Sequence, residues 1–138
     1  MERIIIIASH HKLSLGMKDT IKYITNTNLR IIALAAYMDN TPIDKQIKEI
    51  MNDLSEEDEV FIFTDILAGS VNQKFEKYIQ RPHTNLITGM NLSIIMAIVL
   101  DFSNKYISTE KIENMINSAR KELIYVNNAK VQLDEDDE

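Results

Sequence analysis

The residues that most constrain the fold of this chain are four consecutive isoleucines at 4–7, within the segment RIIIIA at 3–8. A strand with one face in water alternates apolar and polar side chains, whereas this segment is apolar on both faces. Such a β-branched run is typical of a strand in a parallel sheet that helices cover on both sides. The segment leads to Ser9, His10 and His11, which include two of the chain's three histidines. We therefore expect a buried strand that places polar chemistry at its carboxyl end.

Strands and helices alternate along the rest of the chain. Apolar runs predict further strands at 30–37, 59–65 and 85–89, with a last candidate at 122–126. Apolar periodicity predicts helices between the second and third strands and at 14–26, 70–79, 91–103 and 109–121. This order indicates one α/β domain over 1–127, an open, mostly parallel, doubly wound sheet of strand order 2-1-3-4 with helices on both faces.

Two helix starts carry capping signals. Thr41 precedes Pro42, which suits a first helical turn, and Thr41 is a candidate N-cap. Ser70, with Gln73 three residues later, matches the Ser-x-x-Gln capping box. Both hydroxyls are therefore predicted to accept backbone N–H groups in the first turn of a helix.

Composition excludes several classes of protein. The 138 residues include no cysteine, which excludes disulfides and thiolate chemistry. The first residues lack the features of a signal peptide, and no apolar run reaches the roughly 20 residues that cross a bilayer, so we expect a cytoplasmic protein without direct membrane insertion.

The net charge is −6, of which the acidic residues 134–138 carry −5. We expect a disordered acidic tail at 128–138, and the lack of a basic stripe argues against nucleic acid as a partner.

Unusual polar residues follow the strands that should lie side by side. Because the carboxyl ends of parallel strands meet at one edge of the sheet, the loops after the first and third strands should face each other. They carry the candidate site residues Ser9, His10, Asp65, Gly69, Ser70 and Asn72, and the loop after the fourth strand adds Gly89 and Asn91. The candidate site therefore lies at this edge.

The chemistry of these residue types points to phosphoryl transfer. A carboxylate such as Asp65 can accept Nδ1–H of His10 and leave Nε2 as a nucleophile or general base. Gly69 permits close backbone approach, and a helix that starts near Ser70 presents N–H groups to an anion such as phosphate. The chain has no Walker-type loop, so we do not expect ATP to be the phosphoryl donor.

Other interpretations of the same residues stay open at this point. Ser70 and Asp65 can be ordinary cap and turn residues, and His10 an ordinary surface residue. His11 is expected to be exposed, because neighbours in an extended chain point in opposite directions. A metal site made of His10, His11 and Asp65 is a further alternative, although zinc normally has three or four convergent ligands.

Three motifs together resemble a known family. IIIIASHHKLSLGMKDTI, FTDILAGSVNQ and ITGMNLSIIMAIV resemble the enzyme IIA components of the mannose/fructose/sorbose class of the bacterial sugar phosphotransferase system (PTS). The resemblance implies that His10 is the phosphorylated histidine, that Asp65 is its aspartate partner and that Ser70 helps to hold the phosphoryl group. It also matches Gly89 and Asn91 to the Gly-x-Asn segment that follows the family's fourth strand.

The resemblance also implies partners. The phosphocarrier protein HPr would donate the phosphoryl group to His10, and an enzyme IIB partner would accept it for sugar uptake through a membrane permease. The protein would thus be a phosphotransferase component with a phosphohistidine intermediate and no metal or organic cofactor. Family members are homodimers that exchange a C-terminal strand, for which 122–126 is the candidate. A regulatory phosphoprotein of the same fold is the alternative function.

The chain departs from the family pattern at three positions. His11 stands where the family usually has glycine, and Val71 and Ser93 stand where it often has proline. None of the groups matched to the phosphorylation chemistry is lost. Some members continue through an Ala/Pro-rich linker into a IIB domain, whereas this sequence ends in acidic residues, so we expect a free-standing IIA protein.

Overall fold

The computed structural model describes residues 1–129, so most of the predicted tail at 128–138 lies outside the described residues. The strands are β1 (Arg3–His10), β2 (Arg30–Ala36), β3 (Glu59–Thr64) and β4 (Thr84–Thr88). The α-helices are α1 (Leu13–Thr25), α2 (Ile43–Asn52), α3 (Ser70–Phe75), α4 (Leu92–Val99) and α5 (Thr109–Arg120), and 3₁₀ helices span Glu76–Gln80 and Val126–Asn128. None of the helices in this part of the chain is long and apolar enough to span a membrane.

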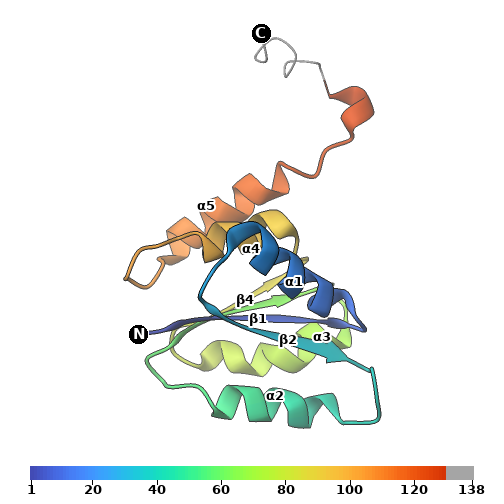
Figure 1. The fold of residues 1–138 in the computed structure, drawn as a ribbon, viewed down its shortest axis with the longest axis vertical. Coiled ribbons are helices and arrows are strands. Elements are labelled where there is room, and N and C mark those ends of the chain that lie inside the picture. Colours follow the sequence, from blue (N-terminus) through green and yellow to red (C-terminus); the bar gives the residue numbers. More distant parts are fainter. Residues whose placement is uncertain (130–138) are drawn as a thin grey trace.

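The four strands form one parallel sheet in the order β2-β1-β3-β4, which confirms the predicted topology. Helices α2 and α3 lie on one face of the sheet, and α1, α4 and α5 lie on the other (Figure 1). β1 is an inner strand, with His10 opposite Ala36 of β2 and Ala8 opposite Thr64 of β3. The loops that follow β1 and β3 therefore meet at the carboxyl edge of the sheet.

The isoleucines of β1 divide between two hydrophobic cores. Ile5 and Ile7 belong to the core on the side of α1, α4 and α5, whereas Ile4 and Ile6 belong to the core on the side of α2 and α3. All four are fully buried, and burial of one such side chain stabilises the fold by about 1.5–3 kcal/mol. The unbroken isoleucine run thus follows from a strand that has no solvent face.

A buried ion pair closes the opposite, amino edge of the sheet. The Arg3 guanidinium donates to the Glu59 carboxylate at 2.6 Å, and both side chains are almost wholly buried. It also donates to the backbone carbonyls of Asp101, at 2.5 Å, and of Lys105, at 3.1 Å. These bonds hold the α4–α5 connection against β1, so α4 ends at Val99 and not near 103 as predicted.

Both capping predictions were wrong. Pro42 occupies the N-cap position of α2, and Thr41 lies in a preceding turn where its backbone N–H donates to Asp39 Oδ1 at 2.8 Å. Gly69 occupies the N-cap position of α3, and Ser70 is the first helical residue. The helix predicted at 70–79 changes to a 3₁₀ helix after six residues of α-helix.

The strand predicted at 122–126 does not form in the single chain. After α5 the chain makes a turn and then runs without regular structure to the 3₁₀ helix at Val126–Asn128. Figure 1 shows this segment leading away from the sheet, and the Leu123 side chain is 93% exposed. A strand requires a neighbouring backbone edge, and this segment pairs with neither edge strand of the sheet, β2 or β4.

Candidate functional site

His10 ends β1 at the carboxyl edge of the sheet, next to Asp65. Its ring Nδ1 lies 2.8 Å from Asp65 Oδ2, and its backbone N–H donates to the same oxygen at 2.8 Å. An ionised carboxylate only accepts, so Nδ1 carries the proton and Nε2 has the lone pair. The His10 side chain is 38% exposed and the Asp65 side chain 11%. Asp65 therefore holds the orientation of the imidazole, and His10 Nε2 faces solvent with its lone pair.

The surroundings of Asp65 favour its ionised form. Burial by itself raises the pKa of this carboxyl, but hydrogen bonds from the His10 backbone and ring and from Ile66 N–H outweigh burial and lower the pKa below its ordinary value. Ile66 N–H donates to Oδ1 at 3.0 Å, which leaves Oδ2 to His10. The carboxylate is therefore charged at neutral pH and fixes the tautomer of the imidazole.

Gly69 brings the backbone of the β3–α3 loop against the imidazole. A Cβ at this position would lie 2.8 Å from His10 Cε1 and 2.9 Å from Ile66 Cγ1, closer than side chains approach in proteins. Glycine is therefore the residue that fits here without displacement of its neighbours. The φ of Gly69 is −79°, so the reason is the close approach and not the backbone conformation.

The Ser70 hydroxyl lies beside His10 Nε2, and the Tyr37 hydroxyl lies beside that of Ser70. Ser70 Oγ is 3.5 Å from this nitrogen and 2.5 Å from the Tyr37 hydroxyl. The Tyr37 ring centroid lies 5.6 Å from that of His10, with the planes at 33°. Sequence reasoning missed Tyr37, because only the loops after the first, third and fourth strands were assigned to the site. The predicted strand order was the signal that could have found it, since β2 lies beside β1 and ends at the same edge.

The turn after β1 places His11 in the left-handed region, at φ +57°. Its side chain is exposed, as predicted, and its backbone N–H donates to Ala36 O at 2.9 Å. Ser9 Oγ holds the turn by donating to His11 O at 3.1 Å and accepting Ser14 N–H at 2.7 Å. Glycine adopts this φ without steric cost, so the glycine that the resemblance leads us to expect at this position would fit the same turn.

Asn72 supports the loop that carries Asp65. It is buried, its Oδ1 accepts from the Thr64 hydroxyl at 2.9 Å, and its Nδ2 donates to Leu67 O at 3.3 Å. These bonds join α3 to the end of β3 and to the loop between them. Asn72 therefore supports the β3–α3 loop of the site, and it makes no hydrogen bond to the imidazole of His10.

Gly89 and Asn91 shape the connection between β4 and α4. Gly89 has a φ of +74°, where glycine is favoured. Asn91 caps α4, because its side chain accepts from Ile94 N–H at 2.9 Å. Within residues 1–129, neither residue makes a hydrogen bond to His10. The structure thus brings His10, Asp65 and the Gly69–Ser70 turn together, and it gives this second loop a structural role.

The metal alternative is not supported. Among residues 1–129, no three histidine, aspartate or glutamate side chains are arranged to hold a metal ion. His11, whose convergence with His10 and Asp65 such a site would need, is exposed at the start of the turn. The chemistry available at this edge is therefore that of an oriented imidazole with neighbouring hydroxyl groups.

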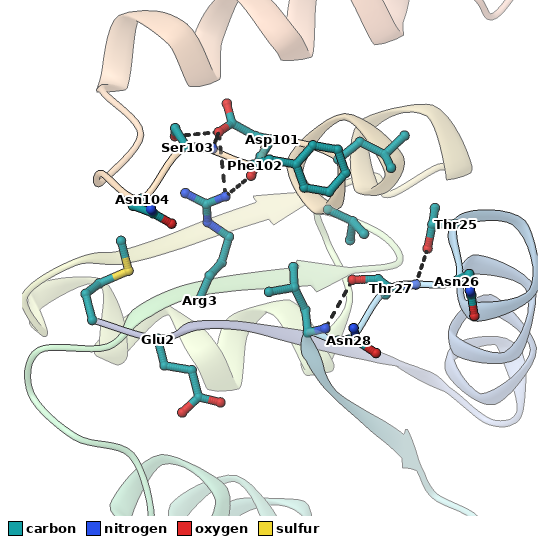
Figure 2. A pocket seen from close by; sticks show the side chains of 14 residues that line it. Glu2, Arg3, Thr25, Asn26, Thr27, Asn28, Asp101, Phe102, Ser103 and Asn104 are labelled. Atoms are coloured by element: carbon teal, nitrogen blue, oxygen red, sulfur yellow. Dashed lines mark hydrogen bonds and ion pairs between the residues drawn. The ribbon is translucent and has the colours of Figure 1, made fainter.

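A separate pocket of about 790 Å³ lies at the amino edge. Figure 2 shows Arg3 in this pocket, with its guanidinium bonded to Asp101, and the Phe102 side chain nearby. The Phe102 side chain is 82% exposed. Arg3 and His10 are the two ends of β1, so this pocket lies at the opposite end of the sheet from the candidate site.

The fold and the site together define an α/β protein with an oriented histidine at the carboxyl edge of an inner parallel strand. The sequence model of the PTS system fructose IIA component family, EIIA-man, matches residues 4–122. The chain therefore belongs to this family of sugar phosphotransferase components, and the resemblance noted in the motifs is confirmed. No protein of curated function gave a significant match.

Solved structures agree with this assignment. A protein from Klebsiella pneumoniae, provisionally called a phosphoenolpyruvate-dependent sugar PTS permease, is 30% identical with a TM-score of 0.82 over 93% of both chains. The PTS IIA protein associated with the fucose utilization operon of Streptococcus pneumoniae is 21% identical, with a TM-score of 0.75 over 92% of this chain and 95% of that chain. A mannose/sorbose specific IIA subunit from Enterococcus faecalis is 11% identical, with a TM-score of 0.72 over 90% and 94%. The last two show likeness of fold alone.

Proposed function

We propose that this protein is a phosphocarrier that accepts a phosphoryl group from phospho-HPr on His10 Nε2 and passes it to an enzyme IIB partner for sugar uptake. The observation that carries the proposal is the bond of 2.8 Å between His10 Nδ1 and Asp65 Oδ2, which leaves Nε2 as the free lone pair. Membership of the PTS IIA family supports this partner pair. We place the protein in the cytoplasm, where these partners would meet it.

The transfer step requires a nucleophile and a charge partner. The Nε2 lone pair attacks phosphorus, the bond between phosphorus and the donor breaks, and its electron pair stays on the donor. The imidazole keeps its Nδ1 proton and becomes positively charged. Asp65, whose pKa is held below its ordinary value, stabilises that charge as the aspartate of a catalytic triad does. Transfer to IIB is the same step in reverse, with a nucleophile of IIB as the acceptor.

The β3–α3 turn supplies the surroundings of the phosphoryl group. Ser70 Oγ, 3.5 Å from Nε2, is within reach of an oxygen of a phosphoryl group bonded to that nitrogen. The first N–H groups of α3 have no acceptor within the helix and favour an anion. Gly69 keeps this turn close to the ring because it lacks a Cβ. The His10 side chain is 38% exposed to solvent, so a partner protein can reach the imidazole.

The proposal is tested by incubation with HPr, enzyme I and labelled phosphoenolpyruvate. The wild-type protein should take up acid-labile phosphate, and His10→Ala should take up none. His11→Ala is the matched control, since it removes the neighbouring imidazole and should still be labelled. Label that survives in His10→Ala would refute the assignment. Labelled protein that then loses its phosphate to the cognate IIB supports transport, whereas retention of the label would favour the regulatory alternative.

We further propose a homodimer in which the segment 122–126 pairs with a second copy. The four apolar residues from Leu123 to Val126 are each more than half exposed in the single chain, and contiguous apolar surface of this kind marks an interaction site. Light scattering should give twice the mass of the chain, and Leu123→Asp should shift it toward the monomer. A wild-type protein that is monomeric at 100-fold dilution and at high concentration alike would contradict the proposal.

A further inference from the structure

We propose that Tyr37 is a positioning residue for phosphoryl transfer and that it acts through the Ser70 hydroxyl. The Tyr37 hydroxyl lies 2.5 Å from Ser70 Oγ, and Ser70 Oγ lies 3.5 Å from His10 Nε2. The three groups form a hydrogen-bonded chain that ends on the nitrogen assigned to accept the phosphoryl group. The inference rests on the proposed function, since it concerns the group that arrives at Nε2.

The direction of donation along this chain follows from Asp65. Because Asp65 accepts the Nδ1 proton of His10, Nε2 can only accept. The chain is complete from end to end only when the single proton of Ser70 points to Nε2 and Tyr37 donates its own proton to Ser70 Oγ. Each hydrogen bond in such a chain polarises the next, so Ser70 is a stronger donor with Tyr37 than without it.

The same direction serves the phosphorylated state. Phosphoryl oxygens are acceptors, as the Nε2 lone pair is, so Ser70 still donates and Tyr37 still donates to Ser70. Neither hydroxyl has to reverse when the phosphoryl group arrives or leaves. Donors that are set before the charge arrives cost no reorganisation during the reaction, and this is the main source of electrostatic catalysis in enzymes.

The backbone conformation of Tyr37 supports a functional role for this residue. Its φ is +64°, a left-handed conformation that is uncommon for a bulky residue. The residue before it, Ala36, is fixed by the N–H of His11 at 2.9 Å. Backbone outliers of this kind persist where the surrounding structure holds them, and they gather at functional sites.

The variant Tyr37→Phe isolates the hydroxyl, because the ring beside His10 is kept. With phospho-HPr at saturating concentration, the rate constant for phosphorylation of His10 should fall about fivefold, which is the scale of one neutral hydrogen bond. In the Ser70→Ala background the same substitution should change the rate less than twofold, since the group through which it acts is gone. The ³¹P resonance of the phosphohistidine should shift in the same direction in Tyr37→Phe and in Ser70→Ala.

Tyr23→Phe is the matched control, because Tyr23 lies on α1 with 89% exposure and its loss should leave rate and resonance unchanged. A Tyr37→Phe rate equal to wild type, or an equal loss in both Ser70 backgrounds, would overturn the inference. Either result leaves the proposed function in place if the wild type is labelled and His10→Ala is not. A wild type that takes no label from phospho-HPr would instead overturn the proposed function and this inference with it.

Discussion

Substitution of Gly69 by alanine is the sharpest test of how the site is built. The new Cβ would lie 2.8 Å from His10 Cε1, 2.9 Å from Ile66 Cγ1 and 3.2 Å from Ile66 O, whereas ordinary contacts begin at 3.4 Å. The contact with the imidazole is thus about 0.6 Å too short, in a range where overpacking costs about 1–3 kcal/mol. The backbone carbonyl gives way least easily, so the imidazole and the Ile66 side chain must move.

Movement of the ring acts on catalysis more than on folding. A shift of this size lengthens the 2.8 Å bond between His10 Nδ1 and Asp65 Oδ2 and turns Nε2 from its line of attack. Because misplacement by 1 Å costs roughly 100-fold in rate, we expect Gly69→Ala to slow phosphorylation by phospho-HPr about 10- to 100-fold. Rapid-quench measurement of labelled protein gives the rate, and urea unfolding gives the stability.

The control for this variant is Gly16→Ala. A Cβ at Gly16 would meet nothing within 4 Å, and in a helix interior alanine is more stable than glycine by about 0.5–1 kcal/mol. Gly16→Ala should therefore raise the free energy of unfolding and leave the transfer rate unchanged. If Gly69→Ala transferred phosphate within twofold of the wild-type rate, the close approach of this loop to His10 would not matter to function and the reasoning would be refuted.

Three further predictions concern charge and backbone. Asp65→Asn should slow phosphorylation of His10 about 100-fold, the scale on which carboxylate partners of histidines act, and an unchanged rate would contradict the assigned tautomer. His11→Gly should raise the free energy of unfolding by about 0.5–1 kcal/mol. The left-handed φ of +57° destabilises a folded residue that has a side chain by about 1–2 kcal/mol, and the greater conformational entropy that glycine loses on folding cancels part of the gain. A urea midpoint lower than that of the wild type would contradict this prediction. Burial by itself raises the pKa of Asp101, but Lys111 and Ser103 outweigh it and lower the pKa to about 2. Because this pKa lies below the ordinary 3.8, the stabilisation is complete above pH 4 and is lost as pH falls toward 2, so the wild type should lose about 2 kcal/mol more than Asp101→Asn over this range. If the free energy of unfolding fell equally with pH in the two proteins, the Asp101 carboxylate would contribute nothing to the pH dependence of stability.

The sequence predicted the features that follow from chain order and strand burial. The isoleucine run identified β1 as an inner strand, and the order of elements gave the sheet topology that the structure has. From that topology alone, the residues after the first and third strands had to meet, and His10 does lie against Asp65. The residues that come together at the strand ends can thus be predicted from sequence, because the topology of a parallel sheet fixes where each strand ends.

The sequence failed where a side chain has more than one local partner. Ser70 was predicted as a cap from Gln73 three residues later, yet its hydroxyl bonds to Tyr37, which is 33 residues away in sequence. A hydroxyl oxygen accepts a hydrogen bond as well from a tertiary neighbour as from a backbone N–H of its own helix, so tertiary neighbours decide. The segment 122–126 failed for a related reason. Its apolar pattern predicts a strand, but in the single chain it pairs with neither edge strand of the sheet, β2 or β4.

The position of β1 in the chain has a consequence for synthesis. β1 is made first, yet Asp65, which directly follows its partner strand β3, comes 55 positions after His10. At roughly 5–20 residues per second, the ribosome needs about 3–11 s to add them. Throughout that interval a strand of four isoleucines has no sheet on its β3 side, and apolar β-branched segments of this kind are prone to aggregate while exposed. The segment that later holds His10 is therefore a part of the nascent chain that benefits from protection by a chaperone.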